Sequence, residues 1–230
     1  MKNRWVSIFV VAALVAVGTN AHAALITYFD NLPPGQGRIG AATTSTDGYG
    51  FLAKRFVTNS SPAGFSLKSV GIHMKEETYD ESFDVGVWGE TSSKPDKNNI
   101  IGTFAQDPLR PISDADFGEA GFIGNISLAS NTAYWIVMSA TSGAYSWSIT
   151  DSGTGSGDWI SNVSASGADA SGSNWNLYSA PPDWTFQMKL QGEPTPAAVP
   201  EPSSILLFGG ILLGAIGYRR RRYPGSADVS

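Results

Sequence analysis

Side chains that commonly carry enzyme chemistry are scarce in this chain of 230 residues. It has no cysteine and two histidines, His22 and His73, which excludes a thiol nucleophile, a zinc–thiolate site and a centre of several histidines. His73 could act as the base of a Ser-His-Asp triad, but no serine lies in a G-x-S-x-G turn. Ile72 and Met74 flank His73, so its side chain should lie opposite an apolar strand face. We therefore expect a solvent-facing strand histidine.

One glycine motif has the spacing of a nucleotide-binding loop. Gly35, Gly37 and Gly40 match the pattern G-x-G-x-x-G, but a dinucleotide site requires a strand before this loop and a helix after it. Pro33 and Pro34 precede the glycines, and no helical pattern follows them. The motif is therefore interpreted as a glycine-rich turn.

Carboxylates form two clusters along the chain. Hard oxygen ligands of this kind can bind calcium, and a facing pair could hydrolyse glycosides, but neither cluster has EF-hand spacing and no spacing singles out a pair. We expect solvated acidic loops, and we predict no catalytic residue, no cofactor and no metal ligand, while calcium binding by these loops stays open. The clusters are Glu76, Glu77, Asp80, Glu81 and Asp84, and Asp114, Asp116 and Glu119.

Three tryptophans are the remaining candidates for ligand contact. Trp88 follows an inward-facing apolar row at the opposite parity, so its side chain should point outward. Trp159 and Trp175 lie in or beside residues 151–174, where glycine and serine fill half of the positions. Exposed aromatic faces can stack on sugar rings, so these three are candidate sugar contacts. The alternative is that they only pin the loop to the domain.

The elements that position these side chains are predicted to be strands. Apolar and polar residues alternate with a period of two, and 26 glycines and 13 prolines suit a turn-rich chain. We predict an all-β fold over residues 24–191, a single antiparallel β-sandwich of the jelly-roll type. The expected strands lie at 25–29, 50–57, 65–74, 83–87, 99–105, 121–128, 132–140, 145–150 and 184–191.

Some strands carry more specific predictions. Residues 132–140 are apolar on both faces, which indicates a central strand that is covered twice. Apolar parity changes near Ser69, which indicates a β-bulge. Residues 151–174 are expected to form a long surface loop. The predicted core contains Val85, Tyr134, Ile136, Trp147, Phe186 and Met188.

The N-terminal 23 residues have the features of an export signal. Lys2 and Arg4 precede an uncharged apolar run at 5–17, and Ala21 and Ala23 supply the small-x-small cleavage pattern. The run is shorter than the roughly 20 residues that a spanning helix needs. We predict that signal peptidase removes residues 1–23, so that the mature chain begins at Ala24.

The C-terminal region has three predicted parts. Residues 192–202 form a proline-rich linker, residues 203–218 an uncharged membrane helix, and residues 219–230 a basic tail. The basic cluster should stay cytoplasmic, which places the β domain outside the inner membrane. The helix between them would then anchor the protein in this membrane, either transiently or permanently. The cluster consists of Arg219, Arg220, Arg221 and Arg222.

The order of these C-terminal features resembles the PEP-CTERM sorting signal of Gram-negative, exopolysaccharide-producing bacteria. In that family a short motif, an apolar helix and an arginine cluster end the chain, and the membrane protease-transpeptidase exosortase removes the helix and the tail. The resemblance implies exosortase as a partner and a final place at the cell surface or in the extracellular matrix. The motif residues are Val199, Pro200, Glu201 and Pro202.

The middle of the chain resembles the choice-of-anchor domains, most closely type R. Those are exported bacterial domains that occur with alternative surface-attachment tails, PEP-CTERM among them. The resemblance implies no catalytic residue that could be carried over. It rests on residues 29–31, the Gly-Tyr-Gly at 48–50, and residues 67–70, 85–88 and 131–137.

The net charge of the mature chain limits the classes of molecule that it can bind. Residues 24–200 contain nine of the 15 basic residues and 18 of the 20 acidic ones, a net charge of −9, which disfavours nucleic acid and anionic lipid. Two function classes remain: a non-catalytic, surface-sorted matrix protein associated with exopolysaccharide, or a secreted carbohydrate-binding or carbohydrate-active protein with a shallow aromatic site. A pocket with two facing carboxylates beside Trp88 or Trp159 would favour the second.

Overall fold

A computed structural model describes residues 24–32, 40–45, 50–61, 63–77, 82–113, 115–150, 159, 163–167, 174–179 and 185–196. Within these residues the regular structure consists of strands, and every paired strand runs antiparallel to its neighbour. The strands are β1 (Ile26–Asp30), β2 (Gly40–Ser45), β3 (Phe51–Val57), β4 (Phe65–Glu76), β5 (Ser82–Thr91), β6 (Lys94–Gln106), β7 (Gly118–Leu128), β8 (Ala133–Ser142), β9 (Ala144–Thr150), β10 (Val163–Gly167), β11 (Trp175–Ser179), β12 (Thr185–Phe186) and β13 (Met188–Pro194).

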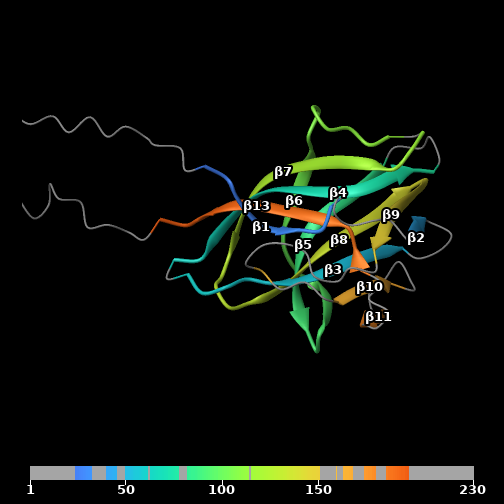
Figure 1. The fold of residues 1–230 in the computed structure, drawn as a ribbon. Helices are drawn as coiled ribbons and strands as arrows, with labels where there is room; N and C mark the ends of the chain where they lie inside the picture. The colour runs from blue at the N-terminus through green and yellow to red at the C-terminus, as the bar shows by residue number, and fades with distance from the viewer. Residues whose placement is uncertain are drawn as a thin grey trace, which may run out of the picture.

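The strands form one continuous sheet that curls into a half-barrel (Figure 1). Its order is β1-β13-β4-β7-β6-β5-β8-β3-β10-β11, and β9 branches off to pair with β4, β2 and β12. The curl depends on β6, which pairs with β5 along most of its length and with β7 at its last residues, Ala105 and Gln106. The predicted all-β, antiparallel class is confirmed. The half-barrel has two walls, one formed by β1, β13, β4 and β7 and the other by β5, β8, β3, β10 and β11. The prediction of a jelly-roll sandwich is corrected, because β6 joins these two walls into one sheet.

The main core fills the concave side of this sheet. Alternation places Val70, Ile72 and Met74 of β4 inward, where they are fully buried. They belong to one cluster with residues of the opposite wall, such as Leu52 of β3 and Ile136 of β8. The six residues predicted for the core all lie in this cluster.

A second hydrophobic cluster covers the outer face of the β3–β5–β8 wall. Trp135 and Val137 of β8 point into it and are buried, whereas Tyr134 and Ile136 face the main core. The prediction that residues 132–140 form a central strand covered on both faces is therefore confirmed. The other buried members of the outer cluster are Phe51, Ala53, Trp88, Ala165 and Trp175.

Local irregularities agree in part with the sequence. The β4–β7 register shifts between Leu67 and Ser69, which confirms the predicted bulge. The prediction of one long surface loop at 151–174 is wrong for Val163–Gly167, because this segment is β10 and pairs with β3 and β11. Strand β13 runs to Pro194, so the first residues assigned to the linker are part of the sheet.

Both predicted targeting segments lie outside the described residues. These are residues 1–23 with the cleavage residues Ala21 and Ala23, and residues 197–230 with the sorting motif, the apolar helix and the arginines. Among the residues that the structure describes, no helix is long and apolar enough to cross a membrane.

Candidate functional site

The three candidate tryptophans are buried. Trp88, Trp159 and Trp175 are 6%, 2% and 6% exposed, so the expectation that they present open aromatic faces is wrong. Trp88 does point away from the main core, as its parity predicted, but it packs against Phe51 at 5.4 Å and Trp175 at 6.2 Å between ring centroids. The outer cluster therefore covers a side chain that the alternation alone would leave in solvent.

Trp159 is held inside the main core. Its indole stacks on Tyr28, with ring centroids 4.4 Å apart, and on Phe56 at 5.2 Å, while the ring of Phe65 meets it edge-on at 5.3 Å. Its main-chain N–H donates to the carbonyl of Tyr28 at 3.0 Å. These contacts correspond to the alternative in which the tryptophan pins its segment to the domain.

His73 links β4 to β9 and to Gln187, the residue between β12 and β13. Its Nδ1 lies 2.7 Å from the Ser148 hydroxyl and 3.2 Å from the Gln187 side-chain oxygen. Ser148 and Gln187 are fully buried, and the Ser148 hydroxyl also donates to the Gln187 side chain at 2.6 Å. His73 faces away from the core, as predicted, but it is half-buried and hydrogen-bonded. A serine hydroxyl enclosed in this way is suited to holding strands together.

A buried lysine is the most unusual polar residue of the domain. Lys54 lies on β3 between the inward-facing Leu52 and Phe56, and it is fully buried. Its amine donates to the Thr185 hydroxyl and to the carbonyl of Phe186, both at 2.6 Å, and lies 4.6 Å from the centre of the Phe29 ring. The lysine thus ties β3 to β12 across the interior of the half-barrel.

Burial sets the protonation of this lysine. Removal from water penalises the ammonium form and holds the pKa of Lys54 well below its usual value of 10.5. A neutral amine has two N–H donors, which match the two acceptors at Thr185 and Phe186. The sequence analysis missed Lys54, although alternation along Leu52, Lys54 and Phe56 was the signal that could have revealed it.

The buried polar cluster around Lys54 includes an asparagine. The Asn31 side chain donates to the carbonyl of Phe186 at 3.2 Å and accepts from the main-chain N–H of Met188 at 2.7 Å. The Gln187 side chain donates to the Asn31 carbonyl at 3.2 Å. Asn31 therefore satisfies main-chain groups at the break between β12 and β13, which is a structural role.

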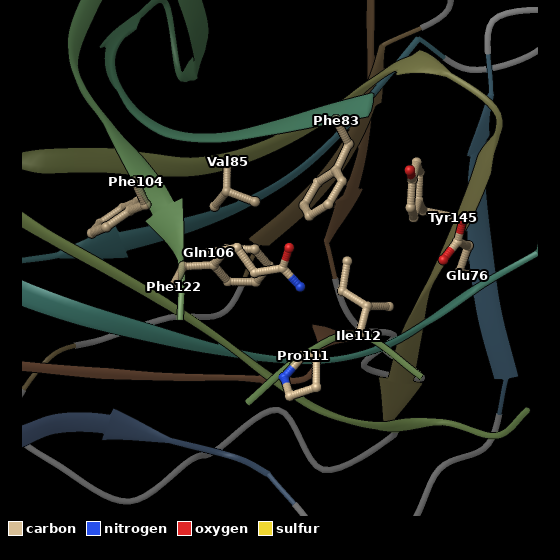
Figure 2. Close-up of a pocket in the computed structure, with 9 residues that line it drawn as sticks. All are labelled: Glu76, Phe83, Val85, Phe104, Gln106, Pro111, Ile112, Phe122 and Tyr145. Atoms are coloured by element: carbon tan, nitrogen blue, oxygen red, sulfur yellow. The ribbon is translucent and has the colours of Figure 1, made fainter. Parts of the chain in front are cut away.

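A pocket opens between the two walls of the half-barrel, close to the point where β6 leaves β5 for β7. Its volume is about 440 Å³ (Figure 2). Most of the described residues that line it are aromatic or aliphatic, and their polar side-chain groups are the Glu76 carboxylate, the Gln106 amide and the Tyr145 hydroxyl. The lining residues are Glu76, Phe83, Val85, Phe104, Gln106, Pro111, Ile112, Phe122 and Tyr145.

This pocket differs from the site that would have favoured a carbohydrate-active protein. Among the described residues that line it, Glu76 is the one carboxylate, and neither Trp88 nor Trp159 borders it. Two of the aromatic rings, Phe83 and Phe122, stand at 83° to each other, so they form a box and not a flat platform. Such a box suits a compact apolar group better than the face of a sugar ring.

Two other described carboxylates of the acidic clusters, Glu77 and Glu119, pair with cations. Glu77 accepts from Lys75 at 2.9 Å and from the Ser146 hydroxyl at 2.5 Å, and Glu119 accepts from Arg110 at 2.9 Å. In the described part of the chain, no group of three His, Cys, Asp or Glu side chains is arranged to hold a metal ion. Asp80, Glu81 and Asp114 lie outside the described residues.

Comparison with known proteins identifies a sorting motif in the C-terminal region. Residues 198–222 match the PEP-CTERM protein-sorting motif. This segment contains the Val199–Pro202 motif and the four arginines. The match indicates an exported protein that exosortase sorts, with transient membrane anchoring through the C-terminal region. No curated protein and no solved structure matches the chain, and the resemblance to choice-of-anchor type R domains is not confirmed.

Proposed function

We propose that the β domain is a non-catalytic component of the cell surface or extracellular matrix, where it associates with exopolysaccharide by binding or scaffolding. The observation that carries this proposal is the sorting motif at residues 198–222, which begins four residues after β13 ends at Pro194. When exosortase recognises a segment at the end of a folded domain, sorting through that segment brings the domain to the cell surface.

The polar groups of the domain support a structural role. His73 is engaged by Ser148 and Gln187, and Lys54 ties β3 to β12 inside the core. The net charge of −9 over residues 24–200 also fits an extracellular location away from nucleic acid and anionic lipid. Sugar contact through Trp88, Trp159 and Trp175 has no support from their burial, so the association we propose does not depend on these rings.

The first expected result concerns processing. Protein isolated from the surface of native cells should begin at Ala24 and lack residues 219–230, because exosortase removes the helix and tail. Intact-mass spectrometry measures both ends at once. Replacing Pro200, Glu201 and Pro202 together by alanine should leave the tail in place. Pro196→Ala, which lies outside the matched segment, should be processed normally and serves as the control.

Retention of residues 219–230 on surface-localised protein would overturn the processing step. In a host without exosortase, the tail should persist and the protein should remain in the inner-membrane fraction. Both fractions can be compared by immunoblotting against the β domain.

The second expected result concerns the polymer. The exported protein should co-sediment with exopolysaccharide from its own host without shortening the chains, as size-exclusion chromatography of the polymer would show. Polymer from an unrelated bacterium is the control. Depolymerisation that a single Asp or Glu substitution abolishes would contradict the non-catalytic role, and absence of co-sedimentation would contradict the association.

A further inference from the structure

The pocket of Figure 2 is not used by the proposed surface role, and its construction points to a ligand. It lies where the last residues of β6 pass from β5 to β7. Val85, Phe122 and Tyr145 are buried and form its inner walls, while Phe83 and Ile112 are partly buried at its edge. Its volume of about 440 Å³ falls within the range of small-molecule sites, roughly 300–1,000 Å³.

The aromatic walls define the shape of the ligand that fits. Phe83 meets Phe122 edge-on with ring centroids 5.6 Å apart, and it is tilted by 46° against Tyr145 at 4.7 Å. In Figure 2 these rings surround the space from different sides and none lies open as a flat surface. An apolar body of the size of a phenyl ring would contact several ring edges and faces at once.

A carboxylate stands at one side of the space between these rings. Val70, Ile72 and Met74 of β4 face the core, and the same alternation directs Glu76 at the end of the strand toward the interior. The main chain there is fixed, since the Glu76 N–H donates to the Ser113 carbonyl at 2.9 Å and Glu76 pairs with Tyr145 of β9. Figure 2 shows the carboxylate beside Tyr145 and the Gln106 amide directed between Phe122 and Ile112.

We propose that this pocket binds a small amine with an apolar body, whose ammonium group pairs with Glu76 and whose body lies against Phe83, Phe122 and Tyr145. A carboxylate beside aromatic walls attracts a cation more strongly than it would in bulk water, because the local dielectric is lower. The net charge of −9 over residues 24–200 favours the approach of cations and disfavours anions. This inference is independent of the sorting of the protein and of its association with polymer.

The test compares two probes of similar shape and opposite charge. Phenethylamine and hydrocinnamate each carry a phenyl ring on a short chain, which ends in an ammonium or a carboxylate. Ligand-observed NMR on the exported protein should give an affinity for phenethylamine that is roughly tenfold higher than for hydrocinnamate, the effect of one charge-assisted hydrogen bond. Equal affinities, or no detectable binding of phenethylamine, would overturn the proposal.

Three variants locate the binding. Glu76→Gln should remove the preference for the amine while leaving the apolar contacts. Glu77→Gln is the matched control, because Glu77 bonds to Lys75 and Ser146 and does not line the pocket. Ile112→Trp at the edge should fill the space and abolish binding of both probes. Far-UV circular dichroism checks that each variant is folded. Unchanged amine binding in folded Glu76→Gln or Ile112→Trp protein would place the amine elsewhere and refute the site.

Discussion

Replacing Trp159 by alanine is expected to lower the free energy of unfolding by about 3–5 kcal/mol, the range for removing a large aromatic side chain from a packed core. The indole is 2% exposed and lies between Tyr28 and Phe56, with Phe65 against its edge. Its loss would leave a cavity that β1, β3 and β4 line together. Equilibrium urea unfolding of the exported protein, followed by far-UV circular dichroism, measures the change.

Trp159→Phe is the matched variant for this experiment. A phenyl ring keeps part of the stack on Tyr28 and Phe56, and the substitution also removes a buried indole N–H that donates to no acceptor among the described residues. The loss should therefore be clearly smaller than for alanine. If Trp159→Ala left stability unchanged and instead weakened polymer binding, the ring would be a surface contact, as the sequence first suggested.

The error over the tryptophans shows where alternation stops being informative. Parity correctly directed Trp88 away from the main core, but it could not show that Phe51 and Trp175 cover that side. Trp175 belongs to β11, which joins this wall through β10 and the pairing of β10 with β3. Burial on the outer face is thus a property of strand order, and local sequence patterns do not contain strand order.

Strand β9 makes the same point from the polar side. Alternation along this strand directs Tyr145, Trp147 and Ile149 to the core, and all three are buried. The same alternation would leave Ser146 and Ser148 on a solvated face, but they are also buried, because β9 packs beside β4, β2 and β12 and not at a free edge. The alternating serines are tolerated there because their hydroxyls bond to Glu77 and Gln187.

The curl of the sheet also could not be predicted from the sequence. Nothing in the composition of β6 indicates that Ala105 and Gln106 pair with β7 after residues 94–104 have paired with β5. The pocket depends on that crossing, so its position could not be predicted. Its inward carboxylate could have been, since Glu76 continues the parity of Ile72 and Met74.

Among the side chains of the domain, Lys54 is expected to cause the largest change in the free energy of unfolding as the pH rises toward 10.5. Lys54→Met keeps an unbranched side chain of similar length, removes the titrating amine and gives up the bonds to Thr185 and Phe186. Lys54→Arg is the control, because a guanidinium cannot shed its proton in the accessible range. An unpaired buried guanidinium should destabilise the domain by several kcal/mol at every pH.

The sign of the pH effect follows from the direction of the shift. The pKa of Lys54 is lowered well below 10.5 by desolvation in the folded state, whereas the unfolded chain titrates near 10.5. Between these two values the unfolded chain binds the extra proton, so stability rises with pH by about 1.4 kcal/mol per unit. The stability gained from deprotonation of Lys54 in the unfolded chain is complete above pH 10.5, and it is lost as the pH falls toward the folded-state pKa of Lys54. Urea unfolding of wild type and Lys54→Met at successive pH values isolates it, since other titrating groups cancel in the difference. A difference that does not change with pH below 10.5 would mean that the lysine keeps its proton in the core and that the folded state supplies it with a counter-charge.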